Sequence, residues 1–254
     1  MTVHACRRIA PLVPTCIVAC AETTRSLHIG LGYPSAKMIE IPNGFDLDQF
    51  KPDLAARERF RSEVGIADDQ ILVGIIGRFV PLKNHRLFVE SAAIAASKHP
   101  GLRFAMIGDG LSADNAKLVS WIRATSDPQR FQLLGRRSDT PGVLNGLDII
   151  VQSSDTEAFP LVLGEGMATG TPVVATNVGD TARLVGDTGE IVPPGHAGEM
   201  ADAILRIAEL GPEQRAELGV RARARIADNF DIELISDRYE QLWRRLAAGQ
   251  KPCD

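Results

Sequence analysis

From residue 71 onward, short apolar runs alternate with stretches in which apolar side chains recur at helical spacing. The run Ile71–Ile76 is long enough for a buried parallel strand, and the apolar residues of 84–98 fall on one helix face. Further strands are expected at 104–107, 131–134, 147–151, 171–175 and 190–192, and further helices at 112–125, 140–146, 159–167, 181–185, 198–209, 212–228 and 232–247. Strands that alternate with helices predict an α/β fold with a doubly wound parallel sheet of Rossmann-like type.

The first 52 residues have a weaker pattern. Strands expected at 16–20 and 37–41 flank a helix expected at 22–31, which is too little to close a hydrophobic core. The stretch 41–52 is rich in Pro, Asn-Gly and Asp and therefore predicts a turn-rich connector, followed by a charged helix at 53–64. We expect three units: residues 1–52, residues 53–230 as the main domain, and residues 231–254 as a C-terminal helix and tail.

The stretch SSDTEAFPLVLGEGMATGTPVVAT, residues 153–176, carries two glutamates eight positions apart. If a helix starts near Phe159, Pro160 occupies its first turn, where a missing N–H costs little. Glu157 then lies in the loop at the positive end of this helix, and Glu165 about one and a half turns further along. Ligands bind beyond the carboxyl ends of strands in open α/β sheets, so these carboxylates and free N–H groups could hold the hydroxyls and phosphates of a nucleotide-sugar.

Two other interpretations of the glutamate pair remain open from the spacing alone. One acid could cap the helix while the other is a solvated surface residue. A glycosidase could use them as acid and nucleophile, although that chemistry is not tied to a strand-to-helix loop.

The loop Gly77-Arg-Phe-Val-Pro-Leu-Lys-Asn84 follows the first strong strand and opens a helix. Arg78 and Lys83 could neutralise a diphosphate, the arginine through a bidentate fork and the lysine as a point charge. Two solvated surface cations are an equally good interpretation of their position. The loop is not a Walker motif, because the G-x-x-x-x-G-K-[ST] spacing is absent.

The segment Gly108-Asp-Gly-Leu-Ser-Ala113 matches G-x-G-x-x-A between a strand and a helix, which is typical of dinucleotide binding. The acid expected after the next strand is replaced by Gly135-Arg136-Arg137. These arginines keep an NADP enzyme as a minor alternative. A tight turn that needs glycine explains the same pattern.

Composition and charge narrow the classes of function. The chain has 254 residues, 44% of them hydrophobic and 24% charged, with a formal net charge of -4 and a pI near 5.8, so we expect no nucleic-acid partner. No apolar run approaches 18 residues, and Pro11 and Pro14 interrupt the N-terminal apolar patch, so we expect neither a membrane span nor a signal peptide. The histidines are scattered and no Cys-x-x-Cys pair occurs, so we expect no metal site.

The motifs taken together resemble the nucleotide-sugar half of retaining GT-B glycosyltransferases of family 4, the group 1 glycosyltransferases. They occur in the family's order over roughly residues 20–245: IPNGFDLDQFKP, GR-x4-K, MIGDG, the Leu134-Gly135 turn, E-x7-E, GTPVV and TGEIVPP. The resemblance implies a GT-B C-terminal domain with an incomplete N-terminal domain in residues 1–52, and a crossover helix after residue 230. It also implies retention of anomeric configuration.

The resemblance further implies roles for individual residues. Arg78 and Lys83, on the loop that begins at Gly77, would bind the donor diphosphate and stabilise the leaving group. Glu157 would contact the donor sugar, and Glu165 would accept hydrogen bonds from the ribose. Backbone groups near Arg136 would hold the base, and amides of Phe159, Pro160, Leu161 and Val162 (proline contributing its carbonyl) would line the sugar and phosphates.

No metal or cofactor is implied beyond the UDP- or GDP-sugar donor. The expected partners are a saccharide or lipid-linked acceptor and a separate N-terminal domain or subunit, in the cytoplasm or at the cytoplasmic face of a membrane. A non-catalytic module that binds nucleotide-sugar is the alternative. Two stretches depart from the common family pattern: Ala158 stands where glycine is frequent, and Val178-Gly-Asp-Thr-Ala-Arg183 lacks the glutamate that many members place shortly after Val-Gly-Gly.

Overall fold

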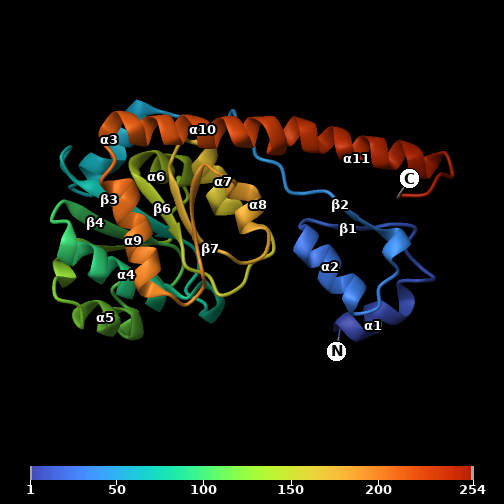
Figure 1. Ribbon diagram of the computed structural model, residues 1–254, viewed down its shortest axis with the longest axis horizontal. Coiled ribbons are helices and arrows are strands. Elements are labelled where there is room, and N and C mark those ends of the chain that lie inside the picture. The colour runs from blue at the N-terminus through green and yellow to red at the C-terminus, as the bar shows by residue number, and fades with distance from the viewer. Residues whose placement is uncertain (1, 253–254) are drawn as a thin grey trace.

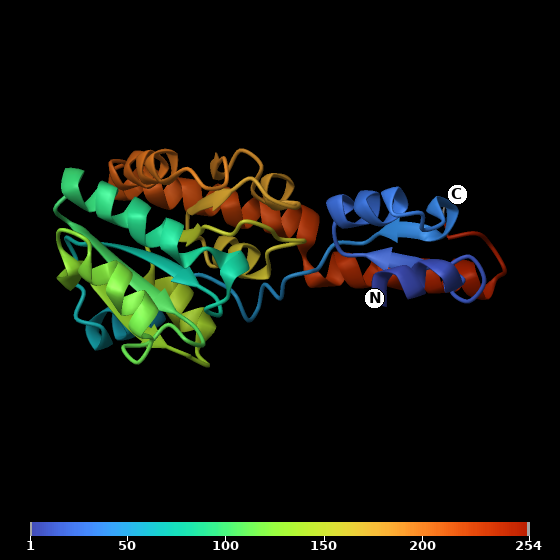
Figure 2. The same cartoon turned by 90° about the horizontal axis from the view of Figure 1, so that it is seen from below.

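The structure is a computed structural model that describes residues 2–252, so position 1 and positions 253–254 of the expected units lie outside it. A larger part surrounds a six-stranded sheet, and a smaller part is formed by residues 2–40, called here the N-terminal segment (Figure 1). Helix α11 (Ile232–Ala247) extends from the larger part alongside the N-terminal segment (Figure 2).

The central sheet is parallel throughout, with the strand order β5-β4-β3-β6-β7-β8. Its strands are β3 (Ile71–Ile76), β4 (Leu102–Ile107), β5 (Phe131–Gly135), β6 (Ile149–Gln152), β7 (Val173–Thr176) and β8 (Gly189–Val192). The chain winds outward from β3 to β5, returns to β6 beside β3, and winds the other way to β8. This order confirms the predicted doubly wound fold and places its switch point between β3 and β6.

Helices cover both faces of the sheet because side chains alternate between the faces along each strand. Ile71, Val73 and Ile75 belong to one buried core, which α4 (His85–Lys98), α5 (Ala116–Arg123) and α9 (Ala197–Ala208) complete. Leu72 belongs to the other core. That core includes α3 (Leu54–Glu63), α6 (Thr140–Gly146), α7 (Leu161–Ala168), α8 (Thr181–Val185) and most of α10 (Pro212–Phe230).

Asp148 fastens β6 beside β3 at the switch point. Its carboxylate accepts the backbone N–H of Leu72 at 2.7 Å and pairs with Arg57 at 2.6 Å and Arg61 at 2.8 Å. The Arg61 side chain is only 5% exposed. A largely buried carboxylate with three donors is well satisfied, so this cluster ties the amino end of β6 to that of β3.

The N-terminal segment contains α1 (Thr2–Ile9), β1 (Ile17–Ala19), α2 (Glu22–Gly30) and β2 (Met38–Glu40). Strands β1 and β2 pair in parallel. Helix α11 packs against this segment through Ile235 and Leu242, which form a small apolar cluster with Ile41 and with Cys16 and Ile39 of the segment.

The two chain segments that connect the parts, around Phe45 and around Asp231, run side by side. The N–H of Phe45 donates to the carbonyl of Phe230 at 2.8 Å, and the N–H of Ile232 donates to the carbonyl of Phe45 at 3.0 Å. The Phe45 ring lies against Phe159, and its atoms would be 2.0 Å from a Cβ added at Gly164. The connector can approach α7 this closely because Gly164 has no Cβ.

Most strands and helices lie within a few residues of their expected positions, and two differences are informative. Helix α7 begins at Leu161 rather than Phe159, because Pro160 is extended (ψ 95°) and forms the N-cap instead of the first turn. Helix α5 begins at Ala116 rather than 112, because the Asn115 side chain caps it by accepting the Leu118 N–H. Within residues 2–252, no helix is both long and apolar enough to cross a membrane.

Candidate functional site

The candidate site is formed by the loops that follow the strands at the switch point, residues 77–84 after β3 and residues 153–160 after β6. Hydrogen bonds join the ends of three neighbouring strands. Gly77 N–H, after β3, donates to Ile107 O of β4 at 2.9 Å, and Gly108 N–H, after β4, donates to Gly135 O of β5 at 2.8 Å. Gly108 has φ +145°, and a Cβ there would lie 2.0 Å from Gly77 O. The glycines after β4 thus serve close packing of three loops, which is the tight-turn interpretation of the G-x-G pattern.

Asn84 joins the two site loops. It adopts the left-handed conformation (φ 44°), caps α4 by accepting the Leu87 N–H, and donates to Asp155 at 2.7 Å. The hydroxyl of Ser153 donates to the carbonyls of Lys83 and Asn84, each at 3.0 Å. The loops are therefore a single hydrogen-bonded unit before any ligand is present.

Lys83 and Glu157 form an ion pair across this unit. The Lys83 Nζ lies 2.6 Å from Glu157 Oε1, and the Ser154 hydroxyl donates to the same oxygen at 2.6 Å. The glutamate side chain is 13% exposed and the lysine side chain 31%. An ammonium group has three donors, so Lys83 keeps donors for a further anion while it holds Glu157.

Arg78 presents a guanidinium group with no hydrogen-bond or ion-pair partner among residues 2–252, and the residue is exposed. Its backbone is held by His85, whose Nε2 donates to the Arg78 carbonyl at 3.0 Å and whose ring stacks on Phe79. Burial lowers the pKa of His85, which keeps the ring neutral, and its buried Nδ1 has no partner in the described chain. His85 is one of the scattered histidines for which no role was expected, although it directly follows Lys83 and Asn84 in the sequence.

Glu165 lies in the middle of α7. Burial raises the pKa of this carboxyl, and no hydrogen-bond or ion-pair partner for it occurs within the described residues. Its neighbours Gly164 and Gly166 pack closely on Phe45 and Ile150. A half-buried carboxylate without donors is suited to accept hydrogen bonds from a ligand's hydroxyl groups.

The start of α7 supplies backbone donors, while its side chains mostly serve the core. Phe159 is 6% exposed and contacts Phe45 and Phe230, and Pro160 is buried. Leu161 is exposed and Val162 is half-buried. The first N–H groups of a helix have no partner within it, so Leu161 and Val162 can offer theirs to an anion.

The two arginines after β5 have different surroundings. Arg137 pairs with Glu63 and with Asp139 at 2.7 Å, which holds the pKa of both carboxyls below their usual range. Arg136 is exposed, and none of the described residues bonds to its guanidinium. Of the two, Arg136 is therefore free to contact a ligand.

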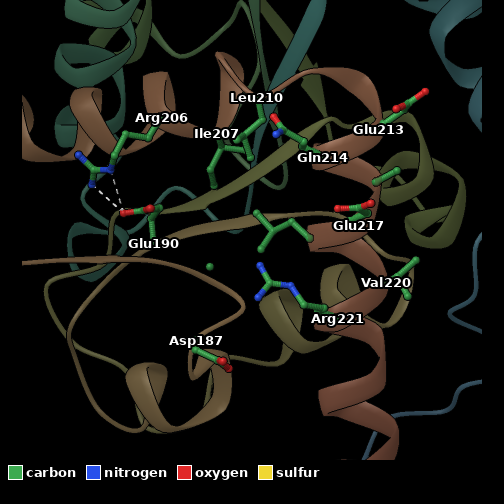
Figure 3. A pocket seen from close by; sticks show the side chains of 13 residues that line it. Asp187, Glu190, Arg206, Ile207, Leu210, Glu213, Gln214, Glu217, Val220 and Arg221 are labelled. Atoms are coloured by element: carbon green, nitrogen blue, oxygen red, sulfur yellow. Dashed lines mark hydrogen bonds and ion pairs between the residues drawn. The ribbon is translucent and has the colours of Figure 1, made fainter.

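A cavity of about 1170 Å³ lies away from these loops. It is bounded by the edge strand β8 and by α9 and α10, and one side carries the Arg206–Glu190 ion pair at 2.7 Å (Figure 3). Volume is a weaker guide than topology in this fold, because open parallel sheets bind ligands at the carboxyl ends flanking the switch point. We therefore place the candidate site at residues 77–84 and 153–165.

Residues 2–252 contain no group of three or more His, Cys, Asp or Glu side chains arranged to hold a metal ion. The Asp-x-Asp spacing at 46–48 is part of a turn, in which Asp46 accepts the N–H groups of Asp48 and Gln49.

Comparison with known proteins gives a consistent picture. The D-inositol 3-phosphate glycosyltransferase of Mycobacterium bovis is 32% identical over 232 residues, which are 89% of this chain and 46% of the relative. The enzyme of that name from Saccharomonospora viridis is 31% identical over 217 residues, 81% of this chain and 49% of the relative. The chain thus spans about half the length of the curated relatives it matches.

Among solved structures, Anabaena Alr3699/HepE in complex with UDP-glucose superposes with a TM-score of 0.86 at 25% identity, covering 97% of this chain and 67% of the other. The same protein with UDP and glucose superposes with a TM-score of 0.85 at 26% identity, covering 94% and 65%. The family model described as "Glycosyl transferases group 1" matches residues 56–225. This chain therefore belongs to the group 1 glycosyltransferase family and contains its GT-B C-terminal domain.

Proposed function

We propose that the chain binds a UDP- or GDP-sugar and serves a retaining, metal-independent glycosyl transfer of the family 4 type. The observation that carries the proposal is the Lys83–Glu157 pair at the switch point, with the free guanidinium of Arg78 on the same loop. The acceptor is a saccharide or a lipid-linked saccharide, as in polysaccharide biosynthesis. The reaction takes place in the cytoplasm or at the cytoplasmic face of a membrane.

The diphosphate is bound by cations and backbone donors. Arg78 forms a bidentate pair with phosphate oxygens, and Lys83 contributes a point charge. As the bond from the sugar to the nucleoside diphosphate breaks, negative charge grows on the leaving oxygen. Arg78, Lys83 and the N-terminus of α7 stabilise that charge in the transition state. Arg78, Lys83 and Glu157 are the residues assigned to catalysis.

The remaining groups orient the donor. Glu165 accepts hydrogen bonds from the ribose hydroxyls, which its partner-free, half-buried carboxylate favours. Glu157 contacts the donor sugar through its carboxylate, which is also bound by the ammonium group of Lys83. Backbone groups near Arg136 contact the base, and amides of residues 159–162 contact the sugar and phosphates. In this proposal no divalent cation takes part, and Arg78, Lys83 and backbone donors alone balance the charge of the diphosphate.

Residues 53–230 form the donor-binding domain, residues 1–52 the acceptor-domain portion with its connector, and residues 231–254 the crossover helix and tail. Support comes from α11, which packs against the N-terminal segment through Ile235 and Leu242. The acceptor binds between the donor site and an N-terminal domain or subunit. Anabaena Alr3699/HepE, solved with UDP-glucose, supports the choice of UDP-sugars as the first donors to test.

Calorimetry with UDP, GDP and UDP-glucose tests the donor site. Loss of a charge-assisted hydrogen bond costs about 1.5–3 kcal/mol, so Arg78→Ala and Lys83→Ala should each weaken binding about tenfold or more. Arg86→Ala and Lys98→Ala are matched controls, because each removes the same side-chain type from α4, where it forms only an exposed ion pair, with Glu90 and with Asp202 respectively. Wild-type affinity in both site variants would rule out the diphosphate site. Transfer is then assayed with saccharide and lipid-linked acceptors.

A further inference from the structure

Asp180, in the loop after β7, caps a helix of the N-terminal segment. Its carboxylate accepts the backbone N–H of Glu22 at 2.8 Å, and the N–H and hydroxyl of Thr23 at 2.9 and 2.7 Å. The N-cap position of α2 is Ala21, which has no side chain able to accept a hydrogen bond. Asp180 therefore supplies the cap that α2 lacks, from 157 positions further along the chain.

A second contact reinforces the first. Arg183 pairs with Asp180 at 3.2 Å and with Glu40 of β2 at 3.1 Å. The Asp180 side chain is 2% exposed and that of Glu40 11%, so both carboxylates are removed from water and depend on these donors. Asp180, at the end of the loop after β7, and Arg183, on α8, thus contact α2 and β2 respectively.

The backbone of the same loop lies against the candidate donor site. The Asp180 N–H donates to the Ala158 carbonyl at 3.0 Å. Gly179 has φ +56°, and a Cβ there would be 2.2 Å from the Glu157 carbonyl oxygen, so the two loops touch backbone to backbone. A continuous path runs from α2 through Asp180 to Ala158 and Glu157, and from Glu157 to Lys83.

We propose that Asp180 is a positioning residue: it couples the docking of the N-terminal segment, through α2, against the loop after β7 to the conformation of the Glu157 loop in the donor site. The coupling rests on the contacts above, and its effect on donor sugar rests on the proposed function. Coupling between two sites is reciprocal in free energy. A ligand that orders the Glu157 loop therefore also tightens the cap on α2, and loosening the cap loosens the loop.

Amide hydrogen exchange in the absence of ligand tests the coupling directly. Asp180→Asn keeps the shape but turns one acceptor oxygen into a donor, so the amides of Glu22 and Thr23 should exchange on the order of ten to a hundred times faster. The amide of Asp155, bonded to the Leu82 carbonyl at 2.9 Å, reports on the Glu157 loop and should also accelerate. Asp187→Asn, which changes an exposed carboxylate after α8, should leave all three amides unchanged.

Thr23→Val provides a milder variant, because it removes one donor and leaves Asp180 and the backbone intact. It should accelerate the same amides to a smaller extent. If Glu22 and Thr23 accelerate in Asp180→Asn while Asp155 does not, the contact is only a tether and the proposal is overturned. Unchanged exchange at Glu22 and Thr23 overturns it as well.

Ligand provides the reciprocal measurement. Saturating UDP-glucose should slow exchange at Glu22 and Thr23 in the wild type and have no such effect in Asp180→Asn. A wild type that binds UDP-glucose without this change contradicts the coupling. A wild type that binds none of UDP, GDP and their sugar conjugates refutes the proposed function, and the ligand-free exchange then decides on Asp180 alone.

Discussion

Glu157 Oε1 lies 2.6 Å from Lys83 Nζ, although the residues belong to loops after different strands. Both groups are proposed to contact the donor, and in the protein without donor they are paired with each other. A donor diphosphate must share Lys83 with Glu157. The pair is partly exposed, so the competition is modest in energy.

Glu157→Gln separates the two roles. Removing the carboxylate charge frees Lys83, so UDP affinity should stay the same or tighten by no more than about fivefold, the upper value for a partly exposed ion pair. UDP-glucose should instead bind about tenfold more weakly than to the wild type, because the charged acceptor for the sugar is lost. Calorimetry with both ligands measures the two effects. Equal changes for UDP and UDP-glucose would show that Glu157 does not contact the sugar.

The structure explains why some of the site could be predicted from the sequence. Apolar runs located the strands, and strand ends located the loops with Arg78, Lys83 and Glu157. The contact between Lys83 and Glu157 could not be predicted from pattern alone, because it depends on β6 returning to the side of β3. The family resemblance implied that Lys83 and Glu157 each contact the donor, but it did not imply that they pair with each other.

Other contacts left no local signal. Asp180 lies in the stretch 178–183, which stood out only for a missing glutamate, and its partner lies at the start of α2, which no periodicity connects to it. His85 resembled a scattered surface histidine, yet it is 2% exposed and holds the Arg78 carbonyl. The start of α7 was predicted too early, because proline fixes φ but leaves ψ free. With an extended ψ, Pro160 is the N-cap and not part of the first turn.

Chelation should leave donor binding unchanged. The proposed diphosphate contacts are Arg78, Lys83 and backbone N–H groups, and the described residues contain no acidic cluster for a divalent cation. UDP titrations in EDTA and in excess magnesium should give the same affinity for the wild type. Binding that requires magnesium or manganese would contradict the metal-independent mechanism.

Glu165→Gln should increase stability and reduce affinity. Burial raises the pKa of Glu165 in the folded protein, so the ionised carboxylate disfavours folding above that pKa. The stability gained by glutamine is therefore present at neutral and alkaline pH, begins to fall as the pH drops through the raised pKa of the folded protein, and is gone below the ordinary glutamate pKa of about 4.3. Urea unfolding at pH 8 and pH 4 measures this difference.

The same variant should bind UDP about tenfold more weakly at neutral pH, because a charged acceptor for the ribose hydroxyls is replaced by a neutral amide. In the wild type, UDP affinity should fall as acid protonates Glu165, and at a higher pH than an exposed glutamate would give. Glu209→Gln changes an exposed carboxylate beyond α9 and is the control. A variant that is no more stable at pH 8, with unaltered UDP affinity, would refute both roles of Glu165.

Gly108→Ala should damage the donor site from a distance. Gly108 has φ +145°, and an added Cβ would lie 2.0 Å from Gly77 O, so the alanine must push away the loop that carries Arg78. Gly195→Ala is a matched control, since Gly195 also has positive φ (+79°) but nothing within 4 Å of the new Cβ. The control should lose about 1–2 kcal/mol from backbone strain alone, and Gly108→Ala about 1–3 kcal/mol more from overpacking. Urea unfolding separates these costs, and UDP binding should weaken only in Gly108→Ala. Equal stability of the two variants, with normal UDP affinity in both, would show that the close approach of Gly108 to Gly77 does not position Arg78.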